Sequence, residues 1–172
     1  MTESYASPAG WIIPFCDAAT EVFLCMLQAT CQIQAIRPPD SAPPLESITI
    51  AIDLTGTAPG RVILSVAETV ADQFVERLTG FGAEGDLGLL RDIVGEVANM
   101  VAGSGKGNLP QLGFLIGTPR QLTAEELINL SANWPLRQTA TLETSFGLCL
   151  LDVSWNFQFA TPSADTPLPE AV

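Results

Sequence analysis

The 172-residue sequence contains no histidine, the side chain that most often serves as a general base or binds a metal ion. This absence excludes Ser-His-Asp and Cys-His catalytic arrangements and the usual zinc motifs. Any catalysis by this chain must therefore use carboxylates, amides, hydroxyls, thiols or amines.

Basic residues are also scarce, with 7 Lys and Arg against 19 Asp and Glu and a formal net charge of −12. This charge repels a phosphate backbone and an anionic membrane surface, so we do not expect nucleic acid as a partner. An acidic protein can meet a basic patch on another protein, but the same charge also serves solubility alone. Charge by itself identifies no partner.

The four cysteines show no C-x-x-C spacing, and three of them fall in one segment with helical periodicity: Cys16, Cys25, Cys31 and Cys149. We interpret them as reduced and mostly buried. No uncharged apolar run reaches the ~18 residues needed to span a bilayer. The acidic N-terminus has no basic region before an apolar segment. The sequence therefore predicts no membrane insertion and a cytoplasmic location.

Hydrophobic residues make up 47% of the chain and charged residues 15%, which is typical of a folded globular protein. The length favours one domain. We expect an N-terminal arm over residues 1–13, a single domain over residues 14–159 and a flexible, proline-rich tail over residues 160–172.

Helical spacing of apolar residues predicts a first helix over residues 14–36, followed by a proline-rich connector over residues 37–44. Further helices are predicted at residues 67–80, residues 87–102 and from Thr123, where Glu126 completes a capping-box pattern. Alternating residues predict two β-hairpins, with strands at residues 48–54, 62–66, 138–144 and 147–159. Within residues 111–122, strand composition extends as far as Gly117, and Pro119 then interrupts the pattern.

The glycine-rich run over residues 95–108 is close to a phosphate-binding loop, but it departs from that motif in two ways. Gly107 stands where the motif needs Ser or Thr. The run also follows a helix, whose C-terminal end repels anions. We interpret these glycines as a helix stop and a turn, not as a nucleotide site.

The predicted helix over residues 87–102 has a polar stripe of Asp92, Glu96 and Asn99, which we expect to face solvent. Such a stripe is most simply the wet side of an amphipathic helix. However, Gly88 and Gly95 flank it, although each costs up to ~1 kcal/mol relative to alanine within a helix. They leave room for another backbone to approach. The opposite face is predicted to join the core through Leu90, Ile93, Val94, Val97 and Val101.

Two segments resemble the CheC, CheX and FliY phosphatases of bacterial chemotaxis, and CheX most closely. "LLRDIVGEVANMVAGSGKG" is similar to the family's D-x-x-x-E-x-x-N-M helix, and "IAIDLTGTAPGRVILSV" to its strand, T-G turn and G-x-V-x-L-S strand. Weaker similarity extends the match over about residues 14–153. The resemblance implies an α/β (α+β) fold in which long helices pack on an antiparallel sheet, and a homodimer.

The resemblance also implies a phosphatase that hydrolyses the aspartyl phosphate of a CheY-like response regulator. Glu96 would pair with the lysine of the receiver's active site, and Asn99 would orient the hydrolytic water. Asp92 and Gly95 would contribute to docking. The Mg²⁺ of the reaction would belong to the receiver, so no metal or other cofactor is expected on this chain. An acyl phosphate is already activated, so positioning of water can suffice without a strong base.

Two alternatives remain open from the sequence. The chain is alternatively a non-catalytic binding module that docks a receiver domain or a flagellar motor component. The second alternative is a purely structural oligomerisation unit, in which the polar stripe has no function.

Overall fold

A computed structural model describes residues 8–42, 44–56, 59–109, 113, 115–130, 134 and 136–156. In chain order the elements are η1 (Pro8–Trp11), α1 (Ile13–Leu27), β1 (Cys31–Arg37), η2 (Pro39–Ser41), β2 (Ile48–Thr55), β3 (Gly60–Val66), α2 (Glu68–Thr79), α3 (Leu87–Gly107), β4 (Leu115–Ile116), β5 (Arg120–Gln121), α4 (Ala124–Ile128), β6 (Leu136–Thr144) and β7 (Gly147–Trp155). The described strands form one seven-stranded sheet in the order β1-β6-β7-β3-β2-β4, and β5 also pairs with β2.

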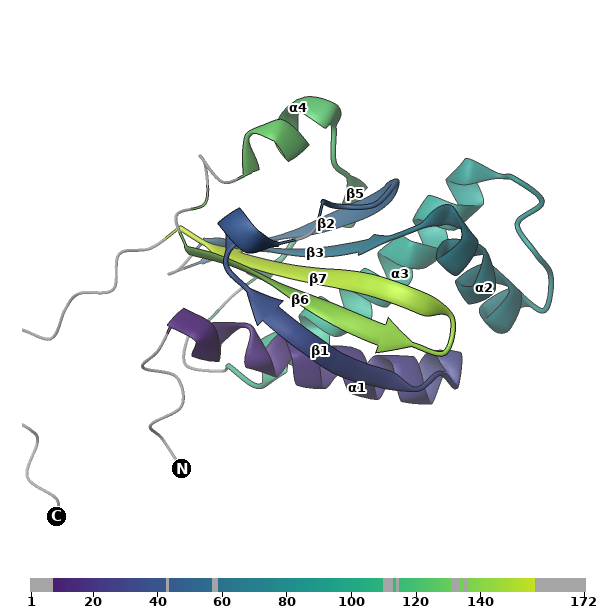
Figure 1. The fold of residues 1–172 in the computed structure, drawn as a ribbon, viewed down its shortest axis with the longest axis horizontal. Coiled ribbons are helices and arrows are strands. Elements are labelled where there is room, and N and C mark those ends of the chain that lie inside the picture. The colour runs from purple at the N-terminus through teal and green to yellow at the C-terminus, as the bar shows by residue number, and fades with distance from the viewer. Residues whose placement is uncertain are drawn as a thin grey trace, which may run out of the picture.

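All strand pairs of this sheet are antiparallel. Helices α1 and α3 lie on one face of the sheet and α4 lies on the other (Figure 1). Strand β2 shows why both faces are covered, since its alternate side chains join different cores. Ala51 joins a small cluster with Ile63, Leu122 and Leu130 on the α4 side. The main cluster, under α1 and α3, takes Ile48, Ile50, Ile52 and Leu54. The predicted fold class is confirmed.

The predicted first helix over residues 14–36 is wrong beyond Leu27. Gln28 adopts a left-handed conformation with φ 49° and ends α1. The chain then turns into strand β1, which pairs with β6. Glutamines alternate with apolar residues in this stretch, which is the period-two pattern of a strand. Cys31 therefore lies on a strand and not on the helix that carries Cys16 and Cys25.

Helix α3 is longer than the predicted 87–102, because it continues through the glycines to Gly107. The interpretation of these glycines as a helix stop and a turn is therefore wrong. Gly105 is buried, and a Cβ at this position would collide with the Phe15 ring of α1. Close packing of two helices thus explains a glycine that disfavours the helix locally.

The remaining element predictions agree with the structure. The β2–β3 and β6–β7 hairpins are present, and Gly80 ends α2 with φ 82°. Thr123 and Glu126 form the expected capping box at the start of α4. The strand predicted within residues 111–122 is reduced to the two-residue strands β4 and β5.

Packed structure starts before Pro14, inside the expected N-terminal arm over residues 1–13. Ile12 is 1% exposed. The Trp11 ring packs edge-on against Trp155, with 6.0 Å between ring centroids. Residues 1–7 and the expected tail over residues 160–172 lie outside the described part of the chain.

Candidate functional site

Helix α3 separates its side chains into a buried face and an exposed stripe, as the sequence predicts. Leu90 is 3% exposed, and Val94, Val97 and Val101 are fully buried. Ile93 is half-buried and packs against the same core. The polar stripe, defined as Asp92, Glu96 and Asn99, is exposed.

The polar stripe lies on a helix that is held firmly at several points. The Asp86 side chain caps the N-terminus by accepting hydrogen bonds from the backbone N–H groups of Gly88 at 2.9 Å and Leu89 at 3.1 Å. Glu96 and Asn99 follow well inside the 21-residue helix. Because the core anchors the opposite face of the same turns, the backbone of these two residues is rigidly placed.

Within the described residues, neither the Glu96 carboxylate nor the Asn99 amide forms a side-chain hydrogen bond or ion pair with another part of the chain. Both groups therefore keep their bonding capacity for a partner. A carboxylate can bind a cation, while an amide both donates and accepts hydrogen bonds and does not titrate. Since both side chains are exposed to water, a reaction that needs water exclusion requires a partner that covers them.

Gly95 has a close neighbour within the chain. It is buried, and a Cβ at this position would lie 3.1 Å from the Cβ of Pro119. The space left by this glycine is thus occupied by the segment between β4 and β5. Gly88 differs, because it is exposed and a Cβ there would meet only the capping side chain of Asp86 at 3.1 Å.

The sequence did not identify Pro119 or its neighbour Thr118 as part of the site. Both are exposed, and Pro119 lies against the α3 turn that carries Glu96. The only signal in the sequence was the interruption of a strand pattern by proline. That signal marks an irregularity of the backbone, but it does not show which helix the irregular segment contacts.

The cysteines are free, and three of the four are buried, as expected. Burial raises the pKa of Cys16 and of Cys149 to about 12, and it also raises the pKa of Cys31. Burial thus disfavours the thiolate, which is the nucleophilic form of these three side chains. Cys25 is exposed. Within the described residues, no group of three or more His, Cys, Asp or Glu side chains is arranged to hold a metal ion.

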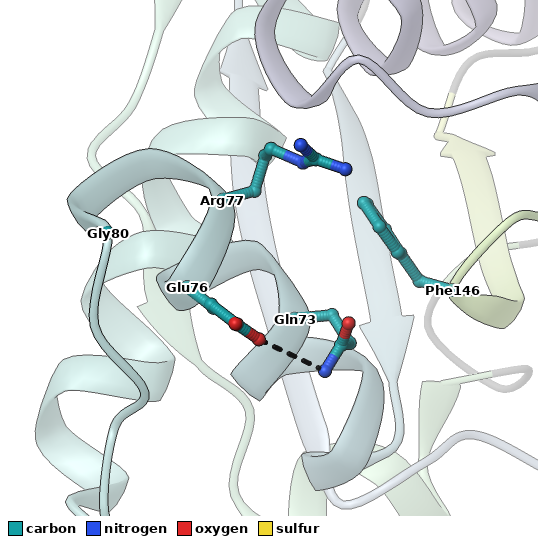
Figure 2. Close-up of a pocket in the computed structure, with 5 residues that line it drawn as sticks. All are labelled: Gln73, Glu76, Arg77, Gly80 and Phe146. Atoms are coloured by element: carbon teal, nitrogen blue, oxygen red, sulfur yellow. Dashed lines mark hydrogen bonds between the residues drawn. The ribbon is translucent and has the colours of Figure 1, made fainter.

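A hollow of about 320 Å³ lies between α2 and the β6–β7 turn (Figure 2). Arg77 points toward Phe146, with its guanidinium carbon 5.9 Å from the ring centre. Gln73 donates a hydrogen bond of 3.5 Å to Glu76. The polar side chains that line the hollow thus contact other residues of the same lining. No residue of the polar stripe lines this hollow. We therefore place the candidate site on α3.

The structure contains no helix, within its described residues, that is long and apolar enough to cross a membrane.

Comparisons with known proteins agree with the fold. The sequence model of a family described as chemotaxis phosphatase CheX matches residues 48–135, which is more than half of the chain and includes α3. A comparison with curated protein sequences gave no match.

Several solved structures share the fold. The chemotaxis protein CheX from Vibrio vulnificus has a TM-score of 0.70 at 18% identity, over 85% of this chain and 99% of that one. CheX from Desulfovibrio desulfuricans has a TM-score of 0.69 at 18% identity, with the same coverage. A CheX–CheY–BeF₃–Mg²⁺ complex from Borrelia burgdorferi gives 0.69 at 18% identity, over 86% and 98% of the two chains. Because the family model matches more than half of the chain, including α3 and the β2–β3 hairpin, this chain belongs to the CheX family of chemotaxis phosphatases.

Proposed function

We propose that this protein hydrolyses the aspartyl phosphate of a CheY-like response regulator in chemotaxis or related two-component signalling. The observation that carries the proposal is the placement of Glu96 and Asn99 on the exposed stripe of α3. Membership of the CheX family supports it. So does a structural relative that is described in complex with CheY, BeF₃ and Mg²⁺.

Glu96 is the docking group in this proposal. Its exposed carboxylate would pair with the active-site lysine of the receiver, and the charge-assisted hydrogen bond would fix the receiver on α3. Asp92, one turn earlier, adds a second negative charge on the same face. We assign it to docking, since a receiver with a basic surface around its active site would meet an acidic stripe.

Asn99 is the catalytic group. Glu96 and Asn99 are three residues apart on one helix, so a receiver fixed at Glu96 would receive the Asn99 amide in its active site. The amide would orient a water molecule in line with the phosphorus–oxygen bond to the aspartate. The bound Mg²⁺ of the receiver would stabilise the developing charge on the phosphoryl oxygens. Docking would also exclude bulk water from the exposed stripe.

The test measures two properties of the same protein. Receivers from the same organism are phosphorylated with acetyl phosphate, and the loss of the acyl phosphate is followed with and without the protein. Binding to the same receivers loaded with BeF₃⁻ and Mg²⁺ is measured in parallel. Faster decay with at least one receiver supports the phosphatase. Binding without faster decay favours the non-catalytic module. If the protein neither binds a receiver nor speeds the decay, the proposed function is refuted.

We also propose that the protein acts as a homodimer in the cytoplasm, where the receivers of two-component systems act. The resemblance to CheX proteins is the basis of both statements. Light scattering after size-exclusion chromatography tests the first, with a mass of about twice 18.2 kDa expected. Cell fractionation tests the second.

A further inference from the structure

A β-bulge separates the two short strands that follow α3. Strand β2 pairs with β4 through Leu54 and Ile116, and with β5 through Ala51 and Arg120. Between these two pairs β2 has two residues, 52 and 53, whereas the partner segment has three, 117–119. The additional residue interrupts the regular strand pairing between Ile116 and Arg120. We call residues 117–119 the ledge.

The ledge is fastened at both ends to Asp53 of β2. The backbone N–H of Gly117 donates to the Asp53 carbonyl oxygen at 2.8 Å. Arg120, directly after the ledge, contacts the Asp53 carboxylate at 3.3 Å and the Glu126 carboxylate at 2.7 Å. The pKa of Glu126 is lowered, first by the hydrogen bond from the Thr123 backbone N–H and further by Arg120. Asp53 and Glu126 thus hold Arg120 from two sides.

The ledge runs alongside α3 at the level of the catalytic group. Pro119 lies against Gly95, where a Cβ would be 3.1 Å from the Cβ of Pro119. Ile116 lies near Gly103, where a Cβ would be 3.9 Å from the Ile116 Cδ1. Asn99 is midway between these two glycines and about one turn from each. The ledge therefore borders the exposed surface from which Asn99 projects.

We propose that the ledge is a second contact surface for the receiver domain, with Thr118 as an exposed contact residue. This inference rests on the proposed function, because it extends the surface that starts at Glu96. Thr118 and Pro119 are exposed. They carry no charge, whereas Asp92 and Glu96 on the neighbouring stripe are acidic. The surface thus fits a receiver with a basic group opposite Glu96 and an uncharged loop opposite Thr118.

A rigid ledge suits discrimination between similar partners. A receiver that docks on Glu96 and Asn99 brings the rim of its active site against the ledge. A large side chain on the ledge or on the receiver would then keep the two surfaces apart. Bulges are frequent next to active sites, where they direct a side chain away from the regular sheet. Pro119 also fixes its own backbone angle and has no N–H that would need a partner in the ladder.

The first experiment replaces Thr118 with tryptophan, with Thr30→Trp as the matched control. Thr30 is also exposed, and it precedes β1 at the opposite edge of the sheet from β4. We expect Thr118→Trp to weaken binding of the cognate receiver, loaded with BeF₃⁻ and Mg²⁺, by about tenfold or more. Single-turnover dephosphorylation should need correspondingly more protein for half-saturation and reach the wild-type rate at saturation. Thr30→Trp should change neither quantity.

The outcomes separate this inference from the proposed function. If the wild type binds and dephosphorylates a receiver while Thr118→Trp does both equally well, the ledge is not a contact surface and the phosphatase stands. If Thr118→Trp lowers the saturated rate with no change in half-saturation, the ledge acts on catalysis and the inference is wrong. If the wild type neither binds nor dephosphorylates any receiver, both statements fail.

A second pair of variants tests the contact between the ledge and α3 without changing Thr118. Gly95→Ala pushes against Pro119, whereas Gly107→Ala, later in α3, meets nothing within 4 Å. Both changes favour the helix locally. We expect receiver binding to weaken only for Gly95→Ala, with circular dichroism unchanged for both. Equal affinity of Gly95→Ala and the wild type would show that receiver binding does not depend on the position of Pro119 against Gly95.

Discussion

Val97 and Asn99, two residues apart on α3, lie in opposite environments: Val97 is fully buried and Asn99 is exposed. Stability and the proposed chemistry therefore depend on different faces of one helix. Mutations on the exposed face can change function without unfolding the protein.

The first prediction compares these two residues in unfolding experiments. Val97→Ala removes buried methyl groups and should lower the free energy of unfolding by ~1–3 kcal/mol. Asn99→Ala should change it by no more than ~0.5 kcal/mol, because the side chain is exposed. Urea unfolding of both variants beside the wild type measures the difference. A larger loss for Asn99→Ala would show that the faces of α3 are assigned incorrectly.

A second stability prediction concerns the buried ion pair between Arg137 and Asp152, which is 2.7 Å long. Thr139 and Ser154 also donate hydrogen bonds to this carboxylate, at 2.7 Å and 3.0 Å. Asp152→Ala removes the buried carboxylate that binds Arg137, Thr139 and Ser154, and it should cost ~3–5 kcal/mol. The double variant Arg137→Met with Asp152→Leu should recover much of this loss. A cost below about 1 kcal/mol for the single variant would mean that solvent reaches the pair.

Local sequence patterns predicted much of the fold, and their failures have physical causes. The glycines at the end of α3 each disfavour a helix, yet Gly105 is needed for contact with Phe15. That gain is tertiary and cannot be seen within the helix itself. After Gln28 a helical pattern passes into a strand pattern, and the shared apolar residues concealed the boundary.

The candidate site was predictable only in part, for a related reason. Helical periodicity alone placed Asp92, Glu96 and Asn99 on one exposed stripe. The position of Pro119 against Gly95 depends on the pairing of β4 and β5 with β2, a contact between distant segments. The sequence interpretation took Gly95 as clearance for a docking partner, whereas in the structure Pro119 of the same chain lies against it.

Thiol labelling provides a third prediction. Burial raises the pKa of Cys16 and Cys149 to about 12, and of Cys31 as well. In native protein at pH 8, a disulfide reagent should therefore label Cys25 rapidly and the other thiols only on unfolding. Cys25→Ser should abolish the rapid phase. Rapid labelling of a second thiol in the native protein would contradict the buried environments.

The fourth prediction concerns Glu96, which we assign to docking. Glu96→Gln removes the charge while preserving the size of the side chain, so it should weaken binding to the receiver loaded with BeF₃⁻ and Mg²⁺ by about tenfold or more. Raising the salt concentration should weaken wild-type binding more than binding of the variant, because a charged contact is screened. Titrations at two salt concentrations measure both effects. Identical affinity and salt dependence would exclude a charged contact at Glu96.

The most direct test of the account is the rate of dephosphorylation of a cognate receiver at saturating protein, with the wild type and with Asn99→Ala. If Asn99 orients the hydrolytic water, the variant should be slower by ~10²-fold or more, as for other groups that act in the transition state. Its affinity for the receiver loaded with BeF₃⁻ and Mg²⁺ should stay within about twofold of the wild type. An equal saturated rate for the two proteins would contradict the catalytic assignment of Asn99.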